Sequence, residues 1–275
     1  MNDKPIGIFD SGIGGLTVVR EVSRQLPQEN ILYFGDTARV PYGSKSPKVV
    51  QLFARQDASF LYDKGVKSII IACNTASAEA FDILQDDFDI PVIGVINPGA
   101  RAASESTKNG KIGVIGTHGT ISSGAYKKAI QDIDKSIEVT AAACPLFVPL
   151  VEEGWESKST TRDIAREYLS PLIEGGIDTL ILGCTHYPIL KPVLQEIVGD
   201  KIILVDSAEA TAGELKQILD EQGLGNSSQE NTDKHSFYVS DFPFKFKEMA
   251  ERFLGKELAE VELVPLEVIE SHATN

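Results

Sequence analysis

The chain has 275 residues, of which 42% are hydrophobic, enough for one large or two ordinary domains with real cores. Its 26 basic and 40 acidic residues give a net charge of -14, which argues against nucleic acid as a partner because phosphate binding needs basic patches and none is visible. The N-terminus lacks the pattern of a signal peptide, and no apolar run approaches the roughly 20 residues that span a membrane. Three cysteines without a framework spacing indicate a reduced, cytosolic setting.

Short aliphatic runs bounded by Gly, Pro or Asn alternate with longer amphipathic stretches. We expect strands at 5–9, 30–35, 67–73, 91–96, 111–116, 137–144, 178–184 and 201–206. We expect helices between them at 48–64, 76–86, 122–132, 160–174 and 208–222. Runs that are apolar on both faces suit the centre of a covered parallel sheet. The alternation therefore predicts an α/β fold with mainly parallel sheets and right-handed crossovers.

One strand pattern occurs twice. The stretch GVKSIIIAC at 65–73 matches GIDTLILGC at 176–184 position by position, 111 residues further on. In addition, IGIFDS at 6–11 resembles IGVIGT at 112–117, so that Ser11 corresponds to Thr117. Chance similarity between hydrophobic strands is the alternative, but it does not readily repeat small, hydroxyl and cysteine positions together. The sequence predicts two similar α/β units that begin near residues 1 and 111.

The C-terminal segment has its own pattern. After a polar, turn-rich stretch at 223–235 we expect a strand at 236–240, a helix around 243–254 and a strand at 260–266. This segment most simply returns to the first unit and completes it. The expected division is a first domain made of residues 1–97 and 208–275, and a second domain made of residues 98–207.

Cys73 and Cys184 each follow a predicted strand and precede a predicted helix, with Asn74 or Thr75, and Thr185, as candidate N-caps. Ligand sites in open α/β sheets lie outside the carboxyl ends of the strands, and a helix N-terminus favours a thiolate. If the two units face each other, a ligand in the cleft meets one thiol on each side. That geometry suits removal of a proton from one face of a carbon and return of a proton to the other face.

Other roles for these two cysteines stay open. Each could be a small buried hydrophobe, or the two could form a redox pair, although they are not a C-x-x-C motif. A zinc site with His186 would lack a convincing fourth ligand, so we expect no metal. Cys144 has no counterpart in the repeat and no polar neighbours in sequence, and we interpret it as structural.

Polar residues near the predicted strand ends are further candidates. Asp10 follows the first strand and could cap a helix, face the first thiol or hold a substrate ammonium group. Tyr42 and Gly43 lie in the loop 35–46, where they could form a wall and offer a backbone N–H, or belong to an ordinary surface turn. His186, expected just inside the second helix, could support the second thiolate or cap that helix. Glu152 could be the counterpart of Asp10 in the second unit.

Four motifs together resemble a known family: GIFDSGIGGL at 7–16, DTARVPYG at 36–43, ACNTAS at 72–77 and GCTHYP at 183–188. Over nearly its whole length the chain resembles the cofactor-independent glutamate racemases of the wider aspartate/glutamate racemase group. The resemblance implies two α/β domains with the active site in the cleft between them. It also implies interconversion of L- and D-glutamate without pyridoxal phosphate, metal or nucleotide.

The resemblance further implies roles for individual residues. Cys73 and Cys184 match the two catalytic thiols, the first acting on the D-substrate and the second on the L-substrate. Asp10, His186 and Glu152 match auxiliary acid–base residues. The positions that match the family's amino-acid-binding residues are Asp10, Ser11, Tyr42, Gly43, Asn74, Thr75, Thr185 and His186.

By the same resemblance, D-glutamate goes into peptidoglycan in a bacterial cytoplasm, and the enzyme is a homodimer with no nucleic acid or membrane partner. Because the chain begins just before its first predicted strand, we expect no control by a cell-wall precursor of the kind tied to N-terminal extensions. Two alternatives stay open. One is a racemase of the same fold that acts on aspartate or another small acid, and the other is a non-catalytic amino-acid-binding module.

Overall fold

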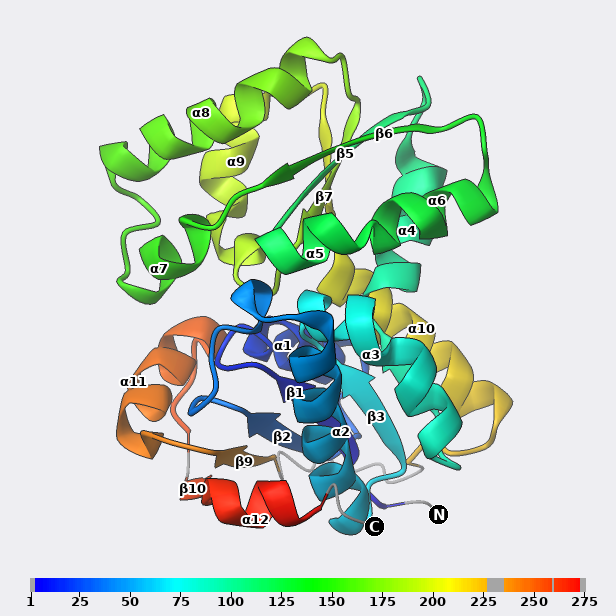
Figure 1. Ribbon diagram of the computed structural model, residues 1–275, viewed down its shortest axis with the longest axis vertical. Helices are drawn as coiled ribbons and strands as arrows, with labels where there is room; N and C mark the ends of the chain where they lie inside the picture. The colour runs from blue at the N-terminus through cyan, green and yellow to red at the C-terminus, as the bar shows by residue number, and fades with distance from the viewer. Residues whose placement is uncertain (1–2, 227–234, 259, 273–275) are drawn as a thin grey trace.

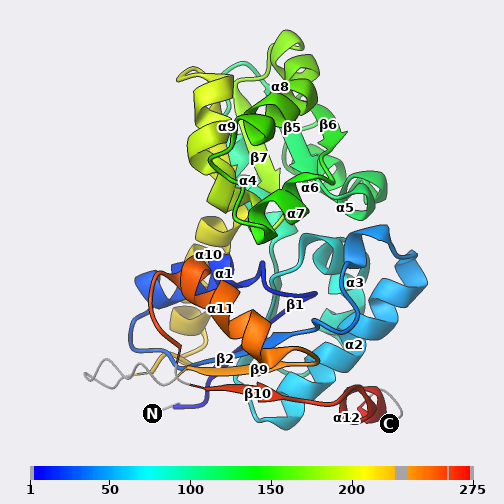
Figure 2. The ribbon, with the colours of Figure 1, turned by 90° about the vertical axis from the view of Figure 1, so that its left-hand side faces the viewer.

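Two parallel β-sheets form the centre of the computed structural model, which describes residues 3–226, 235–258 and 260–272. The strand order is β10-β9-β2-β1-β3-β4 in the first sheet and β6-β5-β7-β8 in the second. Every strand pairing found in the described part of the chain is parallel. Figures 1 and 2 show the second sheet and its helices stacked on the first sheet and its helices. The predicted α/β fold with two domains and parallel sheets is confirmed.

The first sheet and its helices contain both N-terminal and C-terminal segments. Its strands are β1 (Ile6–Asp10), β2 (Ile31–Gly35), β3 (Ser68–Ile71), β4 (Val92–Gly94), β9 (Ser236–Val239) and β10 (Val261–Leu263). The surrounding helices are α1 (Leu16–Gln25), η1 (Tyr42–Ser44), α2 (Pro47–Asp63), α3 (Asn74–Asp87), α10 (Ser207–Glu221), α11 (Pro243–Leu254) and α12 (Leu266–Ser271). Helix α4 (Ile96–Ser106) follows β4 but packs against the second sheet. Strand β9 pairs with β2, so the C-terminal segment extends the first sheet. The domain boundaries themselves stay a prediction.

The second sheet is formed by one continuous part of the chain. Its strands are β5 (Lys111–Gly116), β6 (Glu138–Ala143), β7 (Thr179–Gly183) and β8 (Ile203–Asp206). Its helices are α5 (His118–Ser123), α6 (Ala125–Ile133), α7 (Phe147–Glu152), α8 (Ser159–Glu174), η2 (Tyr187–Leu190) and α9 (Lys191–Val198).

The structure contains the repeat that the sequence predicts. The order β2-β1-β3-β4 has the same arrangement as β6-β5-β7-β8. The register agrees too, because Ile6 pairs with Ser68 in the first sheet and the corresponding Ile112 pairs with Thr179 in the second. The glycines that precede the repeated strands, Gly65 and Gly176, both have a φ of +78°. This left-handed conformation, which glycine adopts without a steric penalty, turns the chain into each strand.

Some predicted elements differ from the structure. The helix predicted at 122–132 is two helices, α5 and α6, because Gly124 between them has a φ of +68° and ends the first helix. The strand predicted at 260–266 is shorter, since helix α12 begins at Leu266. The short helices α7 and α12, and helix α4, are not predicted. None of the helices in the described ranges is long and apolar enough to cross a membrane.

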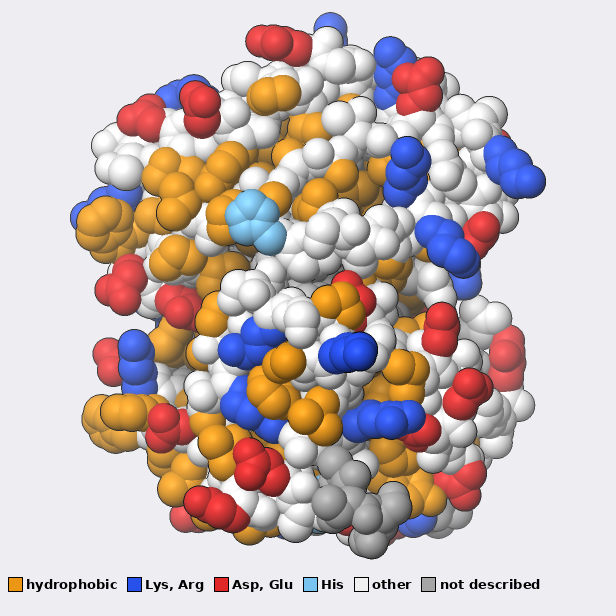
Figure 3. Space-filling model, viewed as in Figure 1, with side chains coloured by type: hydrophobic (Ala, Val, Ile, Leu, Met, Phe, Trp, Pro, Cys, Tyr) orange, Lys and Arg blue, Asp and Glu red, His pale blue; other side chains and the backbone are white. Residues whose placement is uncertain are grey.

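The surface is mixed in character. On the face shown in Figure 3, Lys and Arg side chains are interspersed with acidic and hydrophobic ones, with a small group of them over α2. This face therefore carries no continuous basic stripe of the kind that tracks a phosphate backbone.

Candidate active site

Cys73 lies directly after β3 and is itself the N-cap of α3. Its Sγ accepts a hydrogen bond from the backbone N–H of Ala76 at 3.5 Å. The prediction that Asn74 or Thr75 would cap this helix is therefore wrong by one or two residues, because the helix begins at Asn74. The thiol occupies the position at which backbone N–H groups and the helix dipole favour a negative charge.

Cys184 lies at the corresponding end of β7, but its surroundings differ from the prediction. No α-helix begins beside it: the chain forms the short 3₁₀ helix η2 from Tyr187, and α9 begins only at Lys191. His186 precedes η2 rather than lying inside a helix, and Thr185 is not an N-cap. Prolines 188 and 192 lie in the first turns of η2 and α9, where their missing N–H groups cost nothing. Because a proline is favoured at a helix start, these two residues place the helix starts further along the chain than Cys184.

Thr185 joins the two units at the carboxyl ends of their strands. Its Oγ1 donates to Oδ1 of Asp10 at 3.3 Å, and its backbone carbonyl accepts from Oγ1 of Thr17 at 2.9 Å. The backbone of Gly14 passes so close that a Cβ there would lie 2.2 Å from Oγ1 of Thr185 and 2.5 Å from Nδ1 of His186. The turn after β1 thus lies directly against the residues that follow Cys184.

Asp10 is a buried carboxylate at the end of β1. It accepts a hydrogen bond from the backbone N–H of Gly12 at 3.0 Å, so it caps the turn, and Gly15 occupies the N-cap position of α1. Burial raises the pKa of Asp10 above its ordinary value. The charge of His186 and the hydrogen bonds that Asp10 accepts from Gly12, Gly15 and Thr185 oppose this rise. The protonated form of this carboxyl group is therefore more favourable here than in water.

The Cys73 thiol is held in its neutral form. Burial, and then the charge of Asp10, raise its pKa to about 12, while hydrogen bonds from Ala76 and from the hydroxyl of Ser11 oppose the shift. The charge of Cys184 also raises the pKa of Cys73, so the two sulfurs are near enough to sense each other. Both thiols are 6% exposed, and all three cysteines of the chain are free rather than disulfide-bonded.

His186 is buried between a thiol and a carboxylate. Its Nδ1 lies 4.0 Å from Sγ of Cys184, and its Nε2 lies 3.0 Å from Oε1 of Glu152. Burial acts to lower the pKa of His186, but the hydrogen bonds to Cys184 and Glu152 outweigh it and raise the pKa to about 10. Burial likewise acts to raise the pKa of Glu152, yet the contact with His186 lowers it. The imidazolium form of His186 is therefore favoured beside Cys184.

Asn74 offers a donor toward the site. Its Oδ1 accepts a hydrogen bond from the hydroxyl of Tyr126 at 2.7 Å, which fixes the amide orientation. Its Nδ2 is buried and has no partner among the described residues. A buried N–H without a partner costs free energy, and a ligand oxygen would satisfy it.

A cluster of three hydroxyls joins the units beside this amide. Oγ1 of Thr75 lies 2.9 Å from that of Thr117 and 3.1 Å from that of Thr120. The backbone of Gly43 packs against Thr117, where a Cβ on the glycine would come within 2.6 Å. Sequence reasoning found Thr117 only as the repeat counterpart of Ser11, and it missed Thr120 and Tyr126. Nothing in their local sequence distinguishes them from ordinary helix residues.

The loop that carries Tyr42 and Gly43 is fixed from beneath by buried charges. The hydroxyl of Tyr42 donates to Asp36 at 2.5 Å and to Asp57 at 2.8 Å, and Arg39 contacts both carboxylates. Tyr42 is fully buried, so its hydroxyl faces the protein interior and does not form the wall that the sequence suggested. The loop can still present its backbone N–H groups to a ligand.

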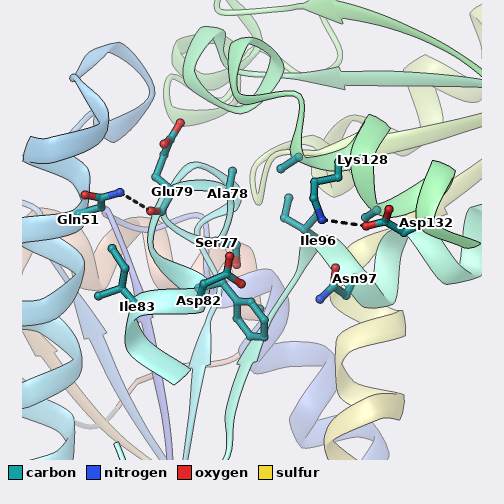
Figure 4. A pocket seen from close by; sticks show the side chains of 14 residues that line it. Gln51, Ser77, Ala78, Glu79, Asp82, Ile83, Ile96, Asn97, Lys128 and Asp132 are labelled. Carbon is teal, nitrogen blue, oxygen red and sulfur yellow. Dashed lines mark hydrogen bonds and ion pairs between the residues drawn. The ribbon is translucent and has the colours of Figure 1, made fainter. Parts of the chain in front are cut away.

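Two open surface pockets have no cysteine in their lining. Figure 4 shows a pocket of about 410 Å³ between α3 and α6, where Lys128 pairs with Asp132 at 2.8 Å. A second pocket of about 290 Å³ includes Gly12, Glu152 and Phe246 in its lining, and it opens beside the buried site. Within the described ranges, no group of three or more His, Cys, Asp or Glu side chains is arranged to hold a metal ion.

The chain matches the family model described as Asp/Glu/Hydantoin racemase over residues 6–215, and it belongs to this family. It is 53% identical to a glutamate racemase of Geobacter metallireducens, over 96% of this chain and 97% of that protein. It is 50% identical to a glutamate racemase of Neisseria meningitidis, over 96% of this chain and 97% of that protein. The chain is an enzyme, an isomerase of the glutamate racemase type.

Solved structures agree over the same length. A glutamate racemase isoform from Bacillus anthracis superposes with a TM-score of 0.93 at 44% identity, covering 97% of this chain and 99% of that one. A glutamate racemase from Francisella tularensis in complex with D-glutamate superposes with a TM-score of 0.90 at 44% identity, with the same coverage. The two-domain architecture is therefore that of known glutamate racemases.

Proposed function

We propose that this enzyme interconverts L- and D-glutamate without a cofactor, by a two-base mechanism in which Cys73 and Cys184 act on opposite faces of Cα. The observation that carries the proposal is the placement of two free, buried thiols at equivalent ends of a repeated strand, near enough for the charge of one to raise the pKa of the other. A racemase needs an acid and a base on opposite sides of one carbon, because a single base tends to return the proton to the face from which it came.

The substrate assignment is supported by the relatives and by the donors around the site. The Francisella tularensis relative is described in complex with D-glutamate. In this chain, we assign the buried Nδ2 of Asn74 and the hydroxyls of Ser11, Thr75 and Thr185, with the backbone of the Tyr42–Gly43 loop, to the groups of glutamate. Asp10 and His186 complete this set. Donors fixed before the reaction stabilise carbanion-like charge as it develops at Cα.

The proton transfers balance across the two thiols. The thiolate on one side takes the Cα proton, so that the Cα–H bond breaks and an S–H bond forms. The thiol on the other side gives its proton to the opposite face, so that its S–H bond breaks and a new Cα–H bond forms. After product release, the protonation states of the two sulfurs are exchanged, and proton exchange with water restores either starting form. We assign Cys73 to the D-substrate and Cys184 to the L-substrate.

The two sulfurs have unlike auxiliary groups. The imidazolium of His186, held by Glu152, favours the thiolate of Cys184. Asp10, whose pKa burial raises, lies near Cys73 and can hold or return a proton on that side. We therefore assign Asp10, Glu152 and His186 as auxiliary acid–base residues.

The cellular role follows from the same assignment. We propose that the D-glutamate supplies peptidoglycan synthesis in a bacterial cytoplasm, and that the enzyme works as a homodimer. The named relatives are bacterial glutamate racemases, which supports this setting. We also propose the division into residues 1–97 with 208–275, and 98–207, as the two bodies that close on the substrate.

The test measures racemisation by the purified chain with no cofactor added. The reaction starts from either enantiomer of glutamate or of aspartate, and circular dichroism monitors it. Cys73→Ser and Cys184→Ser should each lower the rate by about 10³-fold, within the range that acid–base groups contribute. Cys144→Ala is the matched control, because this thiol is also free and buried, donates to the backbone carbonyl of Ala142 and has no counterpart in the repeated strands. Deuterium incorporation at Cα in D2O should accompany racemisation. Full activity in either serine variant would exclude the two-thiol mechanism, and faster turnover of aspartate would reassign the substrate.

A further inference from the structure

Helix α11, in the C-terminal segment, lies below α7 of the other unit in Figure 1, and a side chain of α11 reaches the end of α7. The contact is made by Arg252, in the last turn of α11. Its Nη2 donates to the backbone carbonyl of Val151 at 2.5 Å and to that of Glu152 at 3.1 Å. About 100 residues of chain separate these partners, so the contact connects segments that only the fold brings together.

Carbonyl groups at a helix C-terminus lack partners within the helix, and a cation there is favourable. In α7 the backbone N–H of Gly154 also bonds to the carbonyl of Val151, at 3.1 Å. Gly154 has a φ of +70°, and a Cβ at this position would lie 2.9 Å from Nη1 of Arg252. Glycine at this position adopts the positive φ without strain and leaves room for the guanidinium.

The residues beside this contact belong to the Cys184 side of the site. Glu152 is the last residue of α7, and its carboxylate lies 3.0 Å from Nε2 of His186. Phe253, the neighbour of Arg252, packs its ring edge-to-face with the His186 ring, at 5.9 Å between centroids and 86° between planes. Two consecutive residues of α11 thus contact both members of the pair, one at the backbone of Glu152 and one at the imidazole.

We propose that Arg252 is a positioning residue for racemisation: by holding the backbone of Glu152 it fixes the carboxylate at His186, and so couples α11 to proton transfer at Cys184. The inference rests on the proposed function, in which His186 supports the Cys184 thiolate. Arg252 does not touch the reacting atoms.

Charge supports the same role. The charged groups that face Glu152 are His186, Lys245 and Arg252, and all three favour its carboxylate against the opposing effect of burial. Removing Arg252 takes away one of these cations and the restraint on the backbone. The pKa of Glu152 then rises. Because activity needs the ionised carboxylate, activity is lost at a higher pH in the variant than in the wild type as the pH falls.

The experiment compares Arg252→Met and Arg252→Lys with the wild type and with Arg166→Met. Arg166 is a matched control, because it is an exposed arginine on α8 that pairs only with the exposed Asp163 among the contacts found for it. Arg252→Met should lower kcat/KM by about 10-fold, the scale on which loss of a supporting residue lowers activity, and Arg252→Lys should restore part of it. The acid limb of the kcat/KM profile should move to higher pH in Arg252→Met.

Two readouts separate positioning from mere stability. Because the substrates are enantiomers with an equilibrium constant of one, kcat/KM must fall equally in both directions. The isotope effect with Cα-deuterated substrate should rise more for L-glutamate, whose deuteron goes to Cys184, than for D-glutamate. In ¹⁵N-histidine spectra, the His186 Nε2–H signal should shift in Arg252→Met and stay unchanged in Arg166→Met.

The outcomes are distinguishable. Failure of the wild type and Arg166→Met to racemise glutamate would reject the proposed function itself. If these two are active and Arg252→Met keeps the wild-type kcat/KM and pH profile, the positioning role alone is rejected. It is also rejected if Arg252→Met loses activity only in proportion to a lower Tm, with no change in pH profile, isotope effect or His186 signal.

Discussion

The Sγ atom of Cys184 lies 4.0 Å from Nδ1 of His186, whereas Sγ of Cys73, its counterpart in the repeat, accepts the backbone N–H of Ala76. Two strands with the same order and register thus carry thiols with different partners. A cation flanks Cys184, while the negative charge of Asp10 raises the pKa of Cys73. The two half-reactions are therefore expected to respond differently to substitution, although they act on one carbon.

Replacing His186 tests this asymmetry. We expect His186→Asn to lower kcat by about 10²-fold, because removing an acid–base group lowers the rate by about this factor. Cys184 also loses the cation beside it. The isotope effect should rise more for the enantiomer whose proton goes to Cys184. His118→Asn is the matched control, since His118 is exposed at the start of α5. Equal isotope effects for both enantiomers in His186→Asn would show that the imidazole does not act on one thiol in particular.

Asp10→Asn should weaken catalysis and stabilise the fold. Burial raises the pKa of Asp10 above 3.8, so the folded chain binds this proton more tightly than the unfolded chain does. The free energy of unfolding therefore falls as pH rises from the ordinary pKa toward the raised one, and it stays lower at neutral pH. Asparagine has no proton to lose. Asp10→Asn should show a higher Tm than the wild type at pH 7, and the difference should vanish in acid.

The same substitution changes the Cys73 thiol. Without the charge of Asp10 the pKa of Cys73 should fall, so alkylation of this thiol by a small reagent should reach its half-maximal rate at lower pH. The measurement uses chains in which Cys144 and Cys184 are replaced by Ala. Racemisation by Asp10→Asn with all cysteines present should fall by about 10²-fold, the contribution of an acid–base group. A more reactive Cys73 together with unchanged racemisation would show that Asp10 only tunes the thiol.

The sequence predicts most of the central architecture because buried parallel strands leave a clear signal. The runs that became β1, β3 and β7 are buried at every residue, and their repeat gives the positions of both thiols. The C-terminal strand β9 is also found from its pattern. What sequence reasoning missed around Cys184 depends on two prolines, 188 and 192, which delay the helix start to Lys191.

Other parts of the site depend on contacts between distant residues. Asp57 lies within α2 and reads as an ordinary polar helix position, yet the fold buries it against Arg39 and Tyr42. The contact of Arg252 with Glu152 joins segments 100 residues apart. Such partners share no local pattern, because the energy that pairs them exists only once the sheets and helices have packed.

Gly14 is expected to be essential for the fit of the two units. A Cβ there would lie 2.2 Å from Oγ1 of Thr185 and 2.5 Å from Nδ1 of His186, so one side must move by about an ångström. Displacements of this size at a reacting centre cost about 10²-fold in rate, and we expect that loss of kcat/KM for Gly14→Ala. Gly213→Ala is the control: this glycine lies inside α10 with only Gln25 nearby, at 3.8 Å. It should keep full activity and gain about 1 kcal/mol in helix stability. Wild-type kinetics in Gly14→Ala would refute the close packing at this point.

Arg39 is expected to support the fold through the loop that carries Tyr42 and Gly43. Its guanidinium lies 2.6 Å from Asp36 and 2.9 Å from Asp57, and both carboxylates are fully buried. Removing one partner of a buried pair leaves uncompensated charge, so Arg39→Met should lower the free energy of unfolding by about 3–5 kcal/mol in urea denaturation. Arg55→Met is the control, because this arginine lies on α2 and its ion pair with Asp87 has side chains that are 50% and 34% exposed. That control should cost about 1 kcal/mol or less, because solvent screens the pair. Equal losses in the two variants would mean that the Arg39 network contributes no more than a surface ion pair.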